Sequence, residues 1–304
     1  MTAAALEQNN PQGAPGSIWD ARLSLRVSGG QWGSQLTHAS HEGPLYVQKP
    51  FYPEGADCPH IYLLHPPGGI VSGDSLKLNV SLENTARLLI TTPGCNRLYR
   101  ARTDAPGRAP LKQSVHTELS VQDKCVLEWF PMETIVFNGA SIDLHTHVQL
   151  QEGALFCGWE IVCLGLPACQ SCFDSGDILQ SFALYREQRP VLIDRLQLDA
   201  GCNLLRARCG MAALPVSGLF VVGPLGATGL DQADVEALLD TLRTTIAQRG
   251  WQETLAVTRV NDLLLMRYLG AYADEARDAF TALWQLLRPA MLQRAAVLPR
   301  IWAT

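Results

Sequence analysis

The chain has 304 residues, of which 47% are hydrophobic and only 17% charged, with a net charge of −5 and a pI of about 5.8. This balance lacks the basic stripe that favours nucleic-acid binding. The longest apolar run, residues 154–169, is interrupted by Gly158, Glu160 and Pro167, and it is too short to span a membrane.

The N-terminal residues 1–16 are rich in Ala, Gln, Asn, Pro and Gly, which predicts a disordered tail. They contain neither the basic start nor the apolar core of a signal peptide. The nine cysteines are odd in number, and most lie in apolar runs. Reduced thiols in the cytoplasm are therefore the expectation.

Residues 20–28 alternate between apolar and polar side chains, which predicts a half-buried strand. Short strands of the same kind follow at regular spacing up to residue 222, with turn residues between them, and no segment before residue 230 favours a helix. This pattern predicts a mainly β fold of layered, largely antiparallel sheets.

The C-terminal third changes character, because residues 231–249 and 274–287 each place apolar side chains on one helical face. Asp231 or Thr228 is suited to cap the first helix, and Pro289 is expected to end the second. The sequence thus predicts two helices in this third of the chain.

The stretch from His65 to Asp74 is a ten-residue turn between two predicted strands, and its composition is unusual. Two prolines stiffen it and three glycines permit backbone angles closed to other residues. It is either a rigid structural corner or a rigid loop that holds Asp74 at a working surface. A phosphate-binding loop is excluded, because a strand pattern follows it and the Walker Lys-Ser/Thr pair is missing. The residues that define it are His65, Pro66, Pro67, Gly68, Gly69, Gly73 and Asp74.

Three polar residues share one face of the predicted strand 142–150, namely Asp143, His145 and His147. Two imidazoles and a carboxylate suit Ni²⁺ or Zn²⁺, although the solvated face of a strand has the same pattern. Cys169 and Cys172 have metal or redox spacing, but no second C-x-x-C exists, which favours buried or incidental thiols.

Two further acids stand out. Glu160 is alone in an apolar strand, so it must be paired, ligating or lining a wet passage. Glu133 follows a strand end and is either solvated or functional.

Several motifs resemble the family of urease accessory proteins called UreD, or UreH in some organisms. They are Phe51-Tyr52-Pro53, the loop from Leu64 to Asp74, the run from Leu127 to Pro131 with Glu133, and the tail from Val297 to Trp302. The resemblance covers residues 17–304 and implies one β-rich domain, a β-helix-like stack of strands and two helices. It implies a non-catalytic cytoplasmic protein that binds UreF and, through it, the GTPase UreG.

The resemblance further implies docking on apo-urease and delivery of nickel to its active site through a water-filled passage. The nickel would be transient cargo rather than a cofactor. Candidate residues for the metal path are Asp74, Glu133, Glu160, His145 and His147. Candidates for partner binding are Arg97, Tyr99 and Arg100.

The chain departs from the family pattern at residues 165–171, where an Arg and a Glu of the family are both absent. Their joint loss is expected if the two normally pair. An alternative from another class is a metal-dependent hydrolase that uses Asp74, Asp143, His145 and His147.

Overall fold

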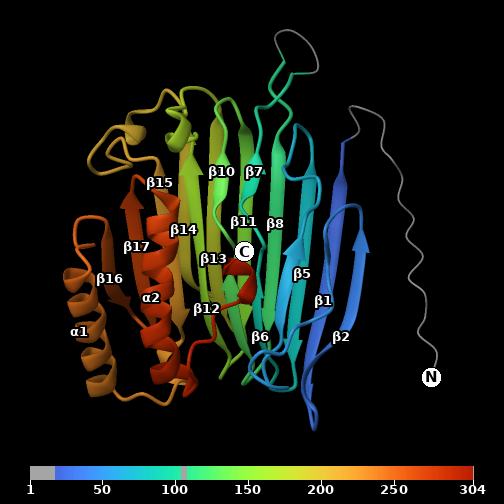
Figure 1. Cartoon of the computed structure of the whole chain (residues 1–304), viewed down its shortest axis with the longest axis vertical. Coiled ribbons are helices and arrows are strands. Elements are labelled where there is room, and N and C mark those ends of the chain that lie inside the picture. Colours follow the sequence, from blue (N-terminus) through green and yellow to red (C-terminus); the bar gives the residue numbers. More distant parts are fainter. Residues whose placement is uncertain (1–17, 104–107, 304) are drawn as a thin grey trace.

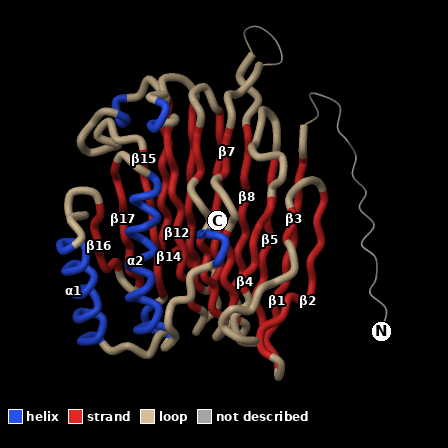
Figure 2. Tube along the Cα trace, in the orientation of Figure 1, coloured by secondary structure: helices blue, strands red, loops and turns tan. Residues whose placement is uncertain are grey.

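The computed structural model describes residues 18–103 and 108–303, and the predicted disordered tail, residues 1–16, lies outside this range. Most of the chain forms strands that gather into two layers, with two helices against one of them (Figures 1 and 2). The mainly β class and the two C-terminal helices are therefore confirmed.

The first layer is a seven-stranded sheet in the order β14-β13-β11-β8-β5-β1-β2. Its strands are β1 (Asp20–Gly30), β2 (Gly33–Glu42), β5 (Ser75–Glu83), β8 (Gln113–Val121), β11 (Ser141–Leu150), β13 (Asp177–Arg186) and β14 (Arg189–Asp199).

The second layer is a ten-stranded sheet with the main order β16-β17-β15-β12-β9-β6-β4-β3, to which β7 and β10 attach beside β12. Its strands are β3 (Tyr46–Val47), β4 (His60–Leu64), β6 (Arg87–Thr91), β7 (Asn96–Leu98), β9 (Val126–Phe130), β10 (Thr134–Val136), β12 (Leu155–Leu164), β15 (Val216–Gly223), β16 (Leu255–Val260) and β17 (Leu263–Gly270).

Strand direction differs from the largely antiparallel expectation, because both sheets are mixed and their central strands are parallel. In the first sheet β1, β5, β8, β11 and β13 all run in parallel, and in the second β4, β6, β9 and β12 do so. The chain repeatedly crosses from one sheet to the other, so the parallel neighbours in the centre of each sheet are separated in sequence by strands of the other sheet. Alternation of apolar and polar residues indicates that one face of a strand is buried, but it does not indicate the direction of the neighbouring strand.

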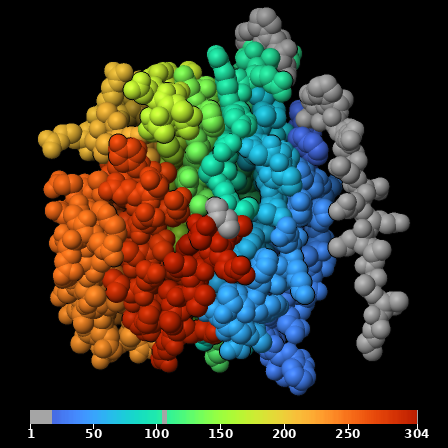
Figure 3. Space-filling view, in the orientation of Figure 1, coloured from blue at the N-terminus to red at the C-terminus, as the bar shows by residue number. Residues whose placement is uncertain are grey.

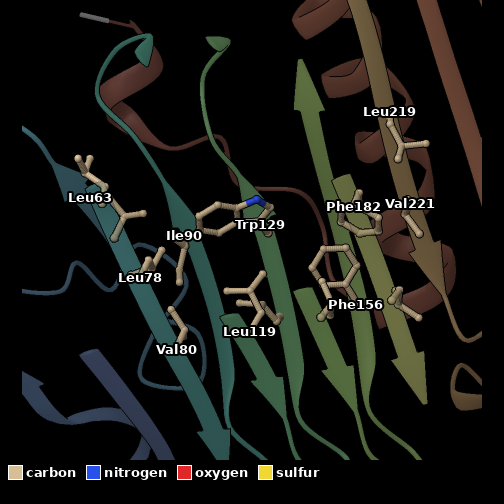
Figure 4. Close-up of a cluster of buried hydrophobic side chains, with 14 of the residues drawn as sticks. Leu63, Leu78, Val80, Ile90, Leu119, Trp129, Phe156, Phe182, Leu219 and Val221 are labelled. Atoms are coloured by element: carbon tan, nitrogen blue, oxygen red, sulfur yellow. The ribbon is translucent and has the colours of Figure 1, made fainter. Parts of the chain in front are cut away.

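One hydrophobic core fills the space between the two sheets. Figure 4 shows Leu78, Leu119 and Phe182 from the first sheet beside Ile90 and Phe156 from the second. All of these side chains are buried. The alternation read in the sequence thus places one face of each central strand in this shared core.

A second core lies between the ten-stranded sheet and helices α1 (Gln232–Gln248) and α2 (Ala273–Leu292). The C-terminal segments, orange to red in Figure 3, cover the left and lower central part of the face shown there. Aromatic rings fill the core under α2, and Phe130 stacks on Trp159 with 4.1 Å between ring centroids. Both helices lie on this one sheet.

The predicted N-terminus of α1 is confirmed, since the Asp231 side chain accepts a hydrogen bond of 2.9 Å from the Asp234 backbone amide. The predicted end of α2 is wrong, because the helix continues through Pro289 to Leu292. Proline removes one helical hydrogen bond, but the last turn also buries Arg288 and Met291, and these contacts keep it helical. Within the described residues, neither helix combines the length and the apolar character needed to cross a membrane.

Candidate functional site

The proline- and glycine-rich loop joins β4 of one sheet to β5 of the other and is held by Asp74. The buried carboxylate of Asp74 accepts hydrogen bonds from the backbone amides of Val71 (2.9 Å) and Trp19 (3.0 Å). Both of its oxygens are therefore used to shape the loop. The structure supports the rigid corner and adds that this corner also anchors the start of β1.

Gly69 of the loop is required by a close approach rather than by its backbone angles. A Cβ at this position would lie 2.2 Å from the Tyr99 ring. The backbone of residues 97–99 is hydrogen-bonded to Ile70 of the loop. The Ile70 amide donates to the Arg97 carbonyl at 2.7 Å, and the Tyr99 amide donates to the Ile70 carbonyl at 3.0 Å. The loop and residues 97–99 thus form one rigid unit.

A cavity of about 350 Å³ opens between the two sheets beside this unit. His65, Gly68 and Gly69 of the loop line it, as does the segment 92–97. Burial lowers the pKa of the His65 imidazole, with the nearby Asp74 carboxylate opposing the effect. A neutral imidazole therefore lines the cavity at the loop.

A second, smaller cavity of about 70 Å³ adjoins the first between the sheets. The two share five lining residues: Asn96, Val115, Thr117, Trp129 and Pro131. Glu160 of β12 lines the smaller cavity, as do His145 and Thr146 of β11 and Gln180 of β13. Glu160 is the only carboxylate among the described residues that line either cavity.

Glu160 is held by two donors from the opposite sheet. Thr146 Oγ1 donates to Oε1, and Gln180 Nε2 donates to Oε2 at 2.9 Å. Burial raises the pKa of the Glu160 carboxyl, and these two hydrogen bonds oppose the effect without cancelling it. Neither donor carries a charge, so Glu160 has no ion-pair partner among the described residues. Of the alternatives that the sequence left open, an ion pair is not seen among the described residues, Glu160 lines a cavity, and metal ligation stays a prediction.

Glu133 has a different environment, because it forms an ion pair of 3.0 Å with Arg277 of α2 and lines neither cavity. Its side chain is largely buried, so the solvated alternative does not hold. The candidates for partner binding lie near the cavity mouth: Arg97 and Arg100 are exposed, and Tyr99 is half-buried. Cys169 and Cys172 are both exposed, so they are not buried thiols.

Asp143, His145 and His147 share the outer face of β11, as the alternation predicted, away from the core side chains Ile142 and Val148. Asp143 accepts a hydrogen bond of 2.9 Å from Lys112. The hydrolase alternative needs Asp74 beside these residues, but the Asp74 carboxylate is occupied by backbone amides in the loop. The structure does not assemble that four-residue set.

Sequence reasoning missed a buried charge network between α2 and the ten-stranded sheet. Arg288 contacts the carboxylates of Glu128 (2.9 Å) and Glu54 (2.7 Å), and His60 Nε2 lies 2.7 Å from Glu54. Glu128 lies in an apolar strand, as Glu160 does, and Arg288 lies on the apolar face of its helix. These two charged residues at apolar positions were the features of the sequence that could have revealed the network.

The ligand atoms of Glu54, Cys58 and His60 lie within 4.8 Å of one another, which is the spacing of a metal site. The Arg288 guanidinium already donates to both Glu54 oxygens, however, and a cation beside it would be repelled. Burial, followed by the charges of Glu128 and Glu54, raises the pKa of the Cys58 thiol far above its usual value, which disfavours the thiolate that binds metals. This cluster is a structural network.

Comparison with known proteins agrees with the motifs in the sequence. The family model described as UreD urease accessory protein matches residues 20–303. A protein of Psychromonas ingrahamii named urease accessory protein UreD is 41% identical over 296 residues, which is 95% of this chain and 96% of the relative. Proteins of the same name from Marinomonas sp. (40% identity, 95% and 91% covered) and Alcanivorax borkumensis (38% identity, 99% and 98% covered) are also similar.

Proposed function

The chain belongs to the UreD urease accessory protein family, and from this premise we propose that it is a non-catalytic cytoplasmic scaffold for urease maturation. In this role it binds UreF, reaches the GTPase UreG through UreF, and docks on apo-urease. Nickel is its cargo, and the protein needs no resident cofactor. The two cavities between the sheets are the route of the metal.

The observation that carries the proposal is the position of Glu160. Among the described residues, this carboxylate has no ion-pair partner, and it lines the smaller of two adjoining cavities, the larger of which is lined by the loop. Burial of an unpaired charge is costly, and a divalent cation would compensate for it. Nickel is a borderline cation that accepts carboxylate and imidazole ligands, which Glu160 and His65 supply in the two cavities of the route.

The electrostatics of Glu160 suit the transfer of a nickel ion rather than its storage. Burial raises the pKa of Glu160, which favours proton binding over metal binding and so weakens the affinity for nickel. Weak sites in series allow an ion to leave as well as to arrive. Asp74 supports the route by holding the loop, and Glu133 is tied to α2 by Arg277. We assign the transfer step to Glu160 and a supporting role to these two acids.

The exposed apolar residues favour the binding of partner proteins. Trp32, Phe51 and Tyr52 are 71%, 44% and 42% exposed, and Phe51-Tyr52 belongs to a motif that carried the resemblance. Uncovered aromatic surface promotes association. Expressed alone, the protein should aggregate, and co-expression with UreF should keep it soluble; abundant soluble monomer without a partner would contradict this.

The test of the route is the change Glu160→Gln, which removes the acid but keeps its volume. The protein is co-expressed with UreF, UreG and urease, and nickel per urease active site is measured beside a pull-down of the complex. We expect normal assembly with a severalfold loss of nickel. The matched control is Glu133→Gln, an acid that lines neither cavity, and it should lose less. Normal nickel filling by an assembled Glu160→Gln complex would remove Glu160 from the route.

A further inference from the structure

Four side chains of the types that bind metals or orient metal ligands lie together on the outer face of the seven-stranded sheet. Strands β8 and β11 run side by side and in parallel (Figure 1), with His145 opposite His116 and His147 opposite Glu118. All four alternate with buried residues of the same strands, so they face away from the core. Neighbouring strands are about 5 Å apart and alternate residues about 7 Å apart. The four side chains thus occupy the corners of a small rectangle.

The structure already orders these side chains in pairs. The rings of His116 and His145 stack with centroids 4.9 Å apart. His147 Nδ1 lies 2.6 Å from Glu118 Oε2, and its ring also packs edge-on against Tyr185 of β13 at 4.8 Å. A carboxylate on one imidazole nitrogen orients the ring and leaves the other nitrogen for a metal. His147 therefore presents Nε2.

Burial and several charged groups act on His116. Burial, followed by the charges of His145 and Lys77, lowers the pKa of His116, while Asp143 and Glu118 oppose the effect. His116 is therefore neutral at neutral pH and has a lone pair to donate. The two nearby acids also offset the charge of Lys77 on β5, and Asp143 in turn is bonded to Lys112.

We propose that His116, His145 and His147 bind one borderline divalent metal ion, of the class of Ni²⁺ or Zn²⁺, on the outer face of this sheet. Glu118 acts as a positioning residue for His147. One ring of the His116–His145 stack turns so that both rings can reach the ion, and water completes the coordination. Three imidazoles with an open position are a stable ligand set for such ions.

The site's side chains alternate with the core-facing residues of β11, although His145 also contributes to the lining of the smaller cavity, and the site goes beyond the proposed function. Strand β11 forms the wall between the site and the smaller cavity, since Thr146 bonds to Glu160 in the cavity while His145 and His147 alternate with it. Metal binding here is measured on the chain purified with UreF, with no urease present. Its failure would leave the Glu160 route untouched, and failure of that route would leave this site untouched.

The test uses the untagged full-length chain, kept soluble by co-purified UreF, at pH 7.5 with Ni²⁺ as the probe in equilibrium dialysis, and the ions bound by UreF alone are subtracted. We expect one ion per chain at the tightest site, not displaced by excess Mg²⁺. The double change His145→Ala/His147→Ala should weaken binding at least tenfold, and Glu118→Gln should weaken it about tenfold. The matched control is His38→Ala, because His38 is an exposed histidine on β2 of the same sheet. It should bind as the wild type does.

Two results would overturn the proposal. One is a folded His145→Ala/His147→Ala variant that keeps wild-type affinity, or a His38→Ala variant that loses as much. The other needs no variant: Co²⁺ bound by the wild-type protein must give the visible absorption bands of imidazole ligation. A spectrum of hydrated Co²⁺ at saturating metal would exclude a three-histidine site.

Discussion

Replacing Arg288 by Met removes the centre of the buried network that ties α2 to the ten-stranded sheet. The guanidinium bonds to Glu128 and Glu54, whose side chains are only 2% and 4% exposed. The Trp284 indole also donates to Glu128 at 2.7 Å. Without Arg288, both carboxylates stay buried and lose their main compensation. We therefore expect a large loss of folding stability.

The size of the loss follows from the burial of the network. Removing one partner of a buried ion pair costs about 3–5 kcal/mol. At about 2 °C per kcal/mol for a large domain, the melting temperature should fall by about 6–10 °C. The exposed pair Arg243–Asp240 on α1 is the matched control. Arg243→Met should cost less than about 1 kcal/mol, because surface ion pairs contribute little.

The assay is thermal unfolding of the single variant and of the triple variant Arg288→Met/Glu54→Gln/Glu128→Gln. Neutralising the two acids together with the arginine removes the uncompensated charges, so the triple variant should recover a substantial part of the loss. Two outcomes would refute the reasoning. One is an Arg288→Met variant no less stable than Arg243→Met, and the other is a triple variant less stable than Arg288→Met.

Three further predictions concern the loop, the folding stability at acidic pH and the exposed thiols. Gly69→Ala should destabilise the protein by about 1–3 kcal/mol, because its methyl group would meet the Tyr99 ring, whereas Gly94→Ala has open space and should be neutral in the same melting assay. Burial raises the pKa of the Glu54 carboxyl, but hydrogen bonds from its basic neighbours outweigh this and bring it to about 2, below the unfolded value of about 4.3. Its stabilisation is therefore present above that value and lost as the pH falls toward 2, so melting temperatures should fall less steeply over this range in Glu54→Gln than in the wild type. Changing both thiols of the exposed pair Cys169–Cys172 to Ser should leave urease activation intact, and a loss as deep as that of a null mutant would reveal a metal or redox role.

What the sequence determined by itself was local. Alternation predicted the strands, the apolar stripes predicted both helices, and Asp231 predicted the start of α1. These features depend on contacts within a few residues, which the order of residues specifies directly. The loop was partly of this kind, since Asp74 bonds to Val71 three residues away.

The tertiary structure decided what depends on distant partners. Strand direction follows from the crossing of the chain between the sheets. The local alternation of apolar and polar residues does not show this crossing. Glu160 was conspicuous in its apolar strand, but its neighbours Thr146 and Gln180 come from the other sheet. Helix α2 passes Pro289 because Arg288 is held by acids more than 150 residues earlier in the chain. Pairing over such separations is set by the packing of whole layers, and for this reason the meeting of His116 and Glu118 with His145 and His147 emerged only when β8 and β11 were placed side by side.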